Sequence, residues 1–207
     1  MLLNIHPDNP DPRKLKQVAE CLLDGGLIIY PTDTVYGMGC DFSNNSAIEK
    51  LCRIKGIKPN KANFSFICSD LSHISEYAKP FGTNIYKLMR KCLPGAFTFI
   101  LNATSKVPKM LNNNRKTVGI RVPDNNIALQ IVSTLGNPII STSLKLNDEI
   151  NEYPTDPELI YEEFHKLVDI VIDGGAGNTE PSTIIDCTES NPQLVRQGAG
   201  ELPFELE

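Results

Sequence analysis

The sequence predicts one α/β domain whose mixed β-sheet has at least seven strands and is flanked by helices. Apolar stretches of strand length alternate with stretches in which apolar residues recur every three or four positions. Several strand stretches follow one another with only a turn between them, which favours a sheet with both parallel and antiparallel pairs. No repeat, low-complexity segment or long linker divides the 207 residues. We therefore expect a single domain over 1–207, with its core at about 10–200.

Five helices are predicted from apolar faces and from the signals at their ends. Ser46 and Glu49 form a capping box before the second helix. Asp124 and Asn125 are polar caps before the fourth, and Asp156 precedes a first-turn proline in the fifth. The expected faces lie at 15–23, 48–52, 85–89, 127–135 and 157–167.

Eight strands are predicted from short apolar runs rich in β-branched and aromatic residues. They lie at 27–30, 64–68, 97–101, 117–122, 137–141, 169–173, 182–186 and 193–197. The longest polar loop between elements is 143–156, which we interpret as a candidate lid.

Charge and composition limit the functions that the chain can have. The net charge is −5, so the whole surface is unsuited to nucleic acid, which is bound by neutralising phosphates with Lys and Arg. A local basic groove remains open. No apolar run approaches the roughly 18 residues of a spanning helix, and the N-terminus lacks a secretory signal. We expect a cytoplasmic protein that does not enter the membrane.

The six cysteines and three histidines do not suggest a metal centre. No two cysteines lie two to four residues apart, and several fall inside apolar runs. Buried thiols are the expected state, rather than a zinc site or a disulfide framework. The histidines are isolated in the sequence. We therefore expect no metal ligands from the chain itself.

Small polar residues follow four of the predicted strands. Loops at strand ends converge into ligand crevices in α/β sheets, and hydroxyl groups with glycine amides suit a small polar ligand or phosphates. Each stretch alone allows another interpretation: a plain turn capped by Asp33, a surface loop at 174–178, or a pairing of Arg121 with a nearby carboxylate. Four such stretches in one domain favour a shared site. They are "YPTDTVYG", "GIRVP", "IISTS" and "GGAGNTEPSTIID".

Basic residues gather after the second predicted helix. Arg53, Lys55, Lys58 and Lys61 fall at its C-terminus and in the following loop. Cations there are favoured by the helix dipole alone, but the cluster could also clamp phosphates, joined by Arg115, Lys116 and Arg196. No Ser-His-Asp, Cys-His or paired-carboxylate set is present. An enzyme with these residues would act by positioning and charge neutralisation, as in phosphoryl or nucleotidyl transfer.

Several of these motifs occur together, in order, in one known protein family. The chain resembles the YrdC-like family, which includes the threonylcarbamoyl-AMP synthases, and most closely its YciO branch. The resemblance covers about 10–200 and rests on these stretches: "GGLIIYPTDTVYGMGCD", "IKG", "LPGAFTFIL", "KTVGIRVPDN", "NPIISTS", "PSTIID" and "VRQGAG".

The resemblance implies a twisted open α/β sheet with a concave, positively charged groove, and a nucleotidyltransferase activity. Members of the family condense ATP, bicarbonate and L-threonine into threonylcarbamoyl-adenylate and pyrophosphate, with Mg²⁺. The product serves the threonylcarbamoyladenosine modification of tRNA. Some members are described as binding double-stranded RNA or tRNA.

The resemblance also implies which residues bind threonine. Thr32 and Thr34 would line the threonine pocket, and Arg121 would clamp the amino-acid carboxylate. Ser141 would bridge threonine and nucleotide, and Ser182 would close the threonine side.

On the nucleotide side, the resemblance implies that Lys55 contacts the ATP phosphates, with Arg196 nearby. Ser143 would bridge to threonine. Lys58 and Lys145 occupy, or lie next to, signature positions of the synthases. Lys55 and Lys58 are therefore the candidate catalytic residues, acting on the leaving pyrophosphate.

Two signatures of the synthases are altered in this chain. Their Lys-x-Arg reads Lys55-Gly56-Ile57, and Lys58 before Pro59 could replace the arginine after a one-residue insertion. A lysine supplies the charge but not the two-pronged guanidinium. Their Ser-x-Asn reads Ser143-Leu144-Lys145. These changes imply weak or altered activity, or, alternatively, a double-stranded RNA or tRNA binding module that uses the basic clusters at 55–61 and 115–116.

Overall fold

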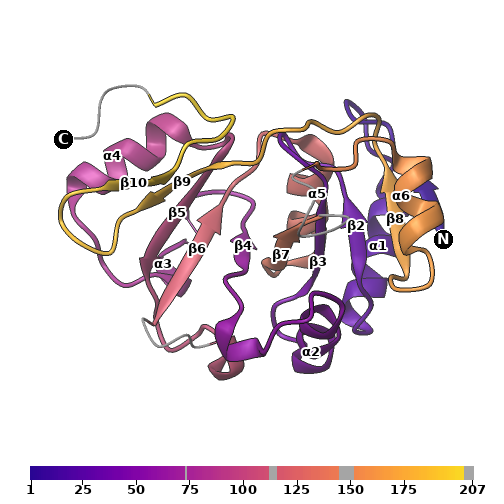
Figure 1. Cartoon of the computed structure of the whole chain (residues 1–207), viewed down its shortest axis with the longest axis horizontal. Coiled ribbons are helices and arrows are strands. Elements are labelled where there is room, and N and C mark those ends of the chain that lie inside the picture. The colour runs from indigo at the N-terminus through magenta and orange to yellow at the C-terminus, as the bar shows by residue number, and fades with distance from the viewer. Residues whose placement is uncertain (73, 112–115, 145–151, 203–207) are drawn as a thin grey trace.

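A single ten-stranded mixed sheet runs through the molecule (Figure 1). The computed structural model describes residues 1–72, 74–111, 116–144 and 152–202. The strands are β1 (Leu2–Asn4), β2 (Ile28–Tyr30), β3 (Gly37–Asp41), β4 (Ser65–Ile67), β5 (Phe97–Asn102), β6 (Thr117–Arg121), β7 (Ile139–Ser143), β8 (Ile170–Asp173), β9 (Thr183–Asp186) and β10 (Gln193–Arg196). Their order is β1-β8-β2-β3-β7-β4-β6-β5-β9-β10. Parallel and antiparallel pairs alternate irregularly, which confirms the predicted mixed sheet.

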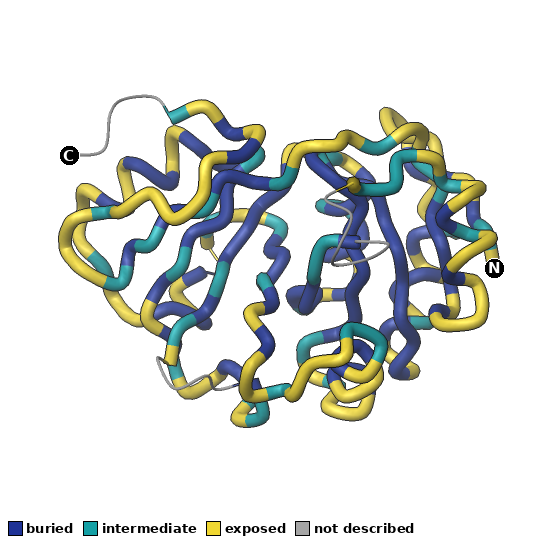
Figure 2. The backbone as a smooth tube through the Cα atoms, viewed as in Figure 1, coloured by how far each residue is buried: buried dark blue, intermediate teal, exposed yellow. Residues whose placement is uncertain are grey.

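Helices cover both faces of the sheet. Successive residues of each strand point to opposite sides, so strands that are apolar throughout need helices packed on both faces. In β2 and the residue before it, Leu27 and Ile29 join one core cluster, while Ile28 and Tyr30 join the other. Helices α1 and α5 contribute to the second cluster, and the remaining helices to the first. Figure 2 shows the buried strands between exposed outer surfaces. The helices are α1 (Pro12–Leu23), α2 (Asn45–Ile54), α3 (Ile74–Tyr77), α4 (Thr83–Cys92), α5 (Asn126–Leu135) and α6 (Pro157–Phe164), with the short 3₁₀ turns η1 (Pro59–Lys61) and η2 (Lys109–Leu111).

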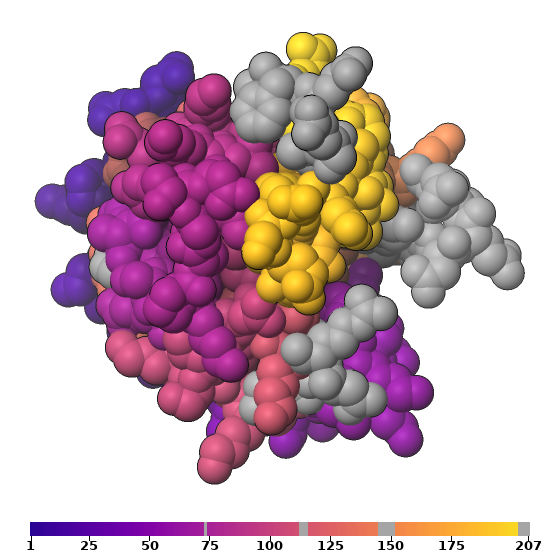
Figure 3. Space-filling view, turned by 90° about the vertical axis from the view of Figure 1, so that its left-hand side faces the viewer, coloured from indigo at the N-terminus to yellow at the C-terminus, as the bar shows by residue number. Residues whose placement is uncertain are grey.

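The segment 174–182 crosses over the sheet from one half of the molecule to the other. It leaves β8 beside α6 and enters β9 beside β5, as the orange-to-yellow trace in Figure 1 shows. At the far end, α4 and the β9–β10 hairpin lie side by side (Figure 3), where Asn84 Nδ2 donates to the carbonyl of Ser190 at 2.9 Å. None of the described helices is long and apolar enough to span a membrane.

Two strands were not expected from the sequence. The first, β1, has only three residues, and it pairs in parallel with β8. The second, β3, contains Gly37 and Gly39, which suggest a loop. A Cβ on Gly39 would lie 2.6 Å from Cγ2 of Ile139 and 2.7 Å from the carbonyl oxygen of Ile140. The glycine therefore allows β3 and β7 to lie close together.

Several predicted element ends need correction. The capping box at Ser46 and Glu49 is wrong, because α2 begins earlier and Asn44 accepts from the amide of Ala47 at 3.1 Å. The caps at Asn125 and Asp156 are confirmed. The last helix ends at Phe164, α3 was not predicted, and the strand expected at 137–141 lies at 139–143.

The loop interpreted as a lid begins later than predicted. Ser143 is the last residue of β7, and the amide of Leu144 donates to the carbonyl of Tyr36 at 2.9 Å. At the other end, the carbonyl of Thr155 accepts from the amide of Gly177 at 2.7 Å. Residues 145–151 lie outside the described part of the chain.

The cysteines behave as the predicted buried thiols. All six are free, and five are buried. Burial raises the pKa of the Cys40 thiol to about 12, and the nearby Asp41 carboxylate adds to this effect. A thiol with this pKa stays protonated and unreactive near neutral pH.

Replacing Gly39 with alanine tests the close approach of β3 and β7. The added methyl group would overlap Ile139 and the backbone of Ile140, so we expect Gly39→Ala to lower the free energy of unfolding by about 1–3 kcal/mol. Urea denaturation measures this change. Gly119→Ala is the matched control, since its nearest neighbour would be Ser65 Oγ at 3.4 Å. Equal stabilities of the two variants would contradict the packing argument.

Candidate functional site

A polar cavity of about 140 Å³ lies among the loop after β2, the strands β4, β6 and β7, and the start of β9. Of the site residues expected from the sequence, the cavity brings together Thr32, Arg121, Ser141, Ser143, Ser182 and Arg196. Three of the other four expected residues are described and lie outside this lining. Thr34 is fully buried and is not among the lining residues, Lys55 and Lys58 lie outside the lining, and Lys145 falls outside the described residues.

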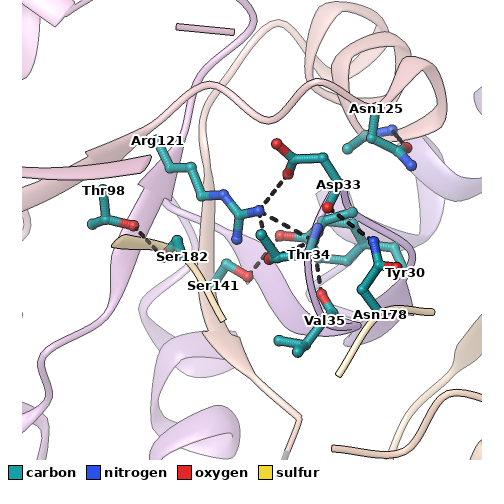
Figure 4. A network of polar contacts seen from close by, with 12 residues as sticks. Tyr30, Asp33, Thr34, Val35, Thr98, Arg121, Asn125, Ser141, Asn178 and Ser182 are labelled. Carbon is teal, nitrogen blue, oxygen red and sulfur yellow. Dashed lines mark hydrogen bonds and ion pairs between the residues drawn. The ribbon is translucent and has the colours of Figure 1, made fainter. Parts of the chain in front are cut away.

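Arg121 is the central charged group of the cavity. It ends β6 and is only 8% exposed. One guanidinium nitrogen, Nη2, donates to Thr34 Oγ1 at 2.7 Å and to Thr32 Oγ1 at 3.3 Å, and it forms an ion pair with the carboxylate of Asp33 (Figure 4). Three consecutive side chains of the loop after β2 therefore converge on one nitrogen atom. The interpretation that Arg121 pairs with a nearby carboxylate is confirmed.

The loop after β2 is a turn as well as a part of the cavity wall. Thr32 Oγ1 donates to the carbonyl of Val35 at 2.7 Å and accepts from the amide of Thr34 at 3.1 Å. These bonds within the loop are those of a turn. The two interpretations of this stretch are compatible, because the turn itself presents Thr32, Asp33 and Thr34 to Arg121.

The crossing segment 174–182 holds this loop from outside. Asn178 donates from Nδ2 to the carbonyl of Asp33 at 3.0 Å and from its amide to the carbonyl of Thr34 at 3.2 Å. Tyr36 donates its hydroxyl to the carbonyl of Gly175 at 2.7 Å. The glycine-rich stretch is exposed, but it is bonded to the cavity wall and is not a free surface loop.

A buried tyrosine orients one cavity hydroxyl. Tyr30 donates to Ser141 Oγ at 2.6 Å, and burial raises the pKa of Tyr30 to about 12. The phenol therefore stays protonated and remains a donor. Because Ser141 accepts this bond, its own hydroxyl is left to donate, and it faces the carbonyl of Met38 at 3.5 Å.

A second hydroxyl pair, Thr98 and Ser182, lines the cavity, and Thr98 was not predicted from the sequence. Thr98 Oγ1 and Ser182 Oγ lie 2.8 Å apart, and both side chains are buried. Thr98 sits within the apolar run "FTFIL" of β5, where its polarity gave no distinct signal. Asn63 and Ser65 also line the cavity and were missed.

The cationic side of the site is built from longer side chains. Arg196 on β10 donates from Nε and Nη2 to the carbonyl of Ser182, at 3.2 and 2.7 Å. Lys55 is the C-cap residue of α2, and its Nζ lies 3.4 Å from the carbonyl oxygen of Ser143. Lys58 is exposed just before η1. Both lysines therefore lie on the segment that leads from α2 to the cavity wall at Asn63.

A second hollow of about 130 Å³ adjoins the first and has a more apolar lining. The two hollows share Asn63, Ser65, Thr98 and Ile184, while Phe64, Val118 and Leu111 are among the apolar residues of the second. A polar and an apolar compartment side by side suit a ligand with a charged part and a flat apolar part.

The described residues offer no place for a protein-held metal ion. No group of three or more His, Cys, Asp or Glu side chains among them could hold one. A resident Mg²⁺ held by these side chains therefore does not fit this site. Mg²⁺ that arrives with a nucleotide is held mainly by phosphates and water, and such an ion belongs to the substrate.

The fold and the motifs are those of one known family. A family model described as "Telomere recombination", the Sua5/YciO/YrdC model, matches residues 20–198. The chain belongs to the Sua5/YciO/YrdC family.

Family members differ in how much is known of them. The uncharacterised protein YciO of Escherichia coli is 44% identical over 97% of both chains. The crystal structure of E. coli YciO aligns with this structure over 98% of each chain, with a TM-score of 0.91. The threonylcarbamoyl-AMP synthase of Vibrio vulnificus is 30% identical over 89% of this chain and 98% of its own length.

One family member has been solved with an amino acid. The structure of Pyrococcus abyssi Sua5 complexed with L-threonine matches 96% of this chain at 26% identity and a TM-score of 0.87. This chain spans 57% of that protein's length.

Replacing Asn178 with alanine tests whether the crossing segment holds the cavity loop. The change removes the bond from Nδ2 to the carbonyl of Asp33, so we expect a loss of about 0.5–1.5 kcal/mol in local stability. Hydrogen exchange of a peptide that contains residues 32–36 should accelerate. Asn84→Ala is the control, because its Nδ2 donates a comparable bond to the carbonyl of Ser190 at 2.9 Å, away from the crossing segment. Unchanged exchange in Asn178→Ala would show that the segment does not hold the loop.

Proposed function

We propose that this chain is an ATP-using enzyme of the threonylcarbamoyl-AMP synthase type. It would condense L-threonine, bicarbonate and ATP into threonylcarbamoyl-adenylate, which serves the threonylcarbamoyladenosine modification of tRNA. The observation that carries the proposal is a small cavity whose lining combines a buried guanidinium, several hydroxyl groups and a second, exposed arginine. The synthase relatives and the threonine complex of P. abyssi Sua5 support it.

In this proposal the amino acid lies against Arg121. Thr32, Asp33 and Thr34 share one guanidinium nitrogen, so the rest of the fork is directed to the threonine carboxylate. Thr32 lines the pocket directly, and Thr34 supports Arg121 from beneath. The hydroxyls of Ser141 and Ser182 would bond the polar groups of the amino acid.

The nucleotide would extend from this end across the second hollow. Its flat base suits the apolar lining near Phe64 and Val118. Its phosphates would meet Arg196 and Lys55, with Ser143 between the two substrates. Lys58 would add charge from the next turn, and Lys145 stays a prediction outside the described residues.

The proposed chemistry needs little covalent help from the protein. The threonine amine and bicarbonate form a carbamate and release water. A carbamate oxygen then attacks the α-phosphorus of ATP, a P–O bond forms, and the bond to pyrophosphate breaks. The cations neutralise the charge that develops on the leaving pyrophosphate, while the walls hold the reactants in line.

The altered signature on the phosphate side favours a slower or modified reaction. Ile57 stands where the synthases carry arginine, and its side chain is 38% exposed. It cannot contribute charge. Lys58 follows Ile57 and is exposed, and Gly56 before Ile57 has a φ of +64°, which permits the extra bend that an inserted residue would require.

An assay with purified protein tests the proposal. ATP, labelled bicarbonate and L-threonine should give pyrophosphate and labelled adenylate, and omission of threonine should abolish the label in the product. Calorimetry should detect binding of ATP and of threonine separately. If no product forms and neither ATP nor threonine binds, the proposal is ruled out.

The roles of the two lysines can be separated by mutation. If Lys58 replaces the synthase arginine, Lys58→Ala and Lys55→Ala should weaken ATP binding to a similar extent, by about tenfold each. Calorimetric titration with ATP measures this. Lys50→Ala is the control. Lys50 lies on α2, the helix that Lys55 caps, but its Nζ donates to the carbonyl of Gly25 and it does not line the cavity. A loss confined to Lys55→Ala would contradict the insertion.

Binding of double-stranded RNA or tRNA stays a prediction for the basic clusters. Such binding rests on phosphate contacts and must weaken as salt rises. No binding at low salt, or binding that is insensitive to salt, would contradict it.

A further inference from the structure

We propose that Asp33 makes the amino-acid end of the cavity electrically neutral, so that this end selects a zwitterionic amino acid over the corresponding anion. The inference rests on the proposed function, because it assumes that an amino acid lies against Arg121. It adds a residue that determines specificity and that does not itself line the described cavity.

The ion pair between Asp33 and Arg121 lies where water hardly screens it. The two side chains are 11% and 10% exposed, and they face each other at hydrogen-bond range. An uncompensated guanidinium at this depth would attract any anion strongly. With Asp33 beside it, the pair carries no net charge, and a ligand with a single negative charge gains little from entering.

Asp33 compensates the charge of Arg121 but binds only one nitrogen of its guanidinium group. Only Nη2 serves the loop, where it is shared among Thr32, Asp33 and Thr34. Within the described residues, Arg121 Nε and Asp33 Oδ2 are both buried and lack a hydrogen-bond partner. A two-pronged ion pair would have used both atoms. The one-pronged pair leaves donors of Arg121 for a ligand carboxylate and keeps the negative charge of Asp33 beside the guanidinium.

The other arginine of the cavity is held differently. Arg196 donates two bonds to the carbonyl of Ser182, which is a neutral acceptor. These bonds fix its position but leave its charge in place. The cavity lining thus combines Arg121, whose charge is compensated by Asp33, with Arg196, which keeps its charge, and this matches a zwitterion beside an anion such as a nucleotide phosphate.

A purely structural role for Asp33 makes a different prediction. If Asp33 served only to hold Arg121 in place, its replacement would weaken every ligand of that end in the same proportion. If it sets the charge, its replacement must change the ratio between ligands that differ in charge alone. Asp33→Asn keeps the shape and one acceptor oxygen while it removes the charge.

The test compares L-threonine with 2,3-dihydroxybutanoate, the same molecule with its ammonium replaced by a hydroxyl. Calorimetry gives both dissociation constants for the wild type, Asp33→Asn and the control Asp24→Asn. The control removes the same charge at the exposed C-cap of α1. We expect the wild type to prefer threonine by about tenfold or more, and Asp33→Asn to shift this ratio toward the acid by about tenfold or more. Asp24→Asn should leave the ratio unchanged.

The outcomes separate this inference from the function on which it rests. An unchanged ratio in folded Asp33→Asn, with threonine bound by the wild type, overturns the role of Asp33 and leaves the proposed function standing. A wild type that binds neither ligand overturns the proposed function, and the inference with it. If Asp33→Asn does not fold, the wild-type ratio decides alone, since equal affinity for acid and amino acid overturns the inference.

Discussion

The bonds from Arg121 Nη2 to the loop after β2 are the constraint on which the candidate site depends. Arg121 ends β6, and three strands separate β6 from β2 in the sheet. A flat sheet would keep these strands too far apart for one side chain to connect them. The right-handed twist and the bend of the sheet bring the loop toward β6. The cavity lies in the resulting concavity, so its floor and its charge are set by the same contacts.

The crossing segment gives this arrangement its second support. A chain that passes from β8 to β9 must run over the loop after β2, and Asn178 and Tyr36 bond the segment and the loop to each other. The loop is therefore held by Arg121 on the cavity side and by Asn178 on the outer side. Backbone carbonyls that would otherwise face solvent become acceptors, and the turn keeps one conformation. A site held in this way is preorganised for its ligand.

The sequence revealed the hydroxyl and arginine residues of the site because they follow apolar strands, where polar side chains are conspicuous. It hid Thr98, whose hydroxyl lies inside an apolar run and is satisfied by Ser182. It also hid β3, since glycines favour loops unless a neighbouring strand requires them. The N-cap of α2 was misplaced from Asn44 to Ser46 because both residues cap well. Which of the two residues caps the helix depends on where the chain leaves β3, and the tertiary structure decides this rather than the local sequence.

The two ends of the cavity differ in how firmly their residues are fixed. Around Arg121 the residues lie on strands and on a doubly held loop, and Thr32, Thr34, Arg121 and Ser141 are all buried. The cationic residues are Lys55 at a helix end and exposed Arg196 on the edge strand β10. A change at the buried end disturbs packing and charge together, whereas a change at the exposed end alters charge alone. Substitutions among the exposed cationic residues can therefore alter the charge of the site while the fold and the buried residues around Arg121 stay intact.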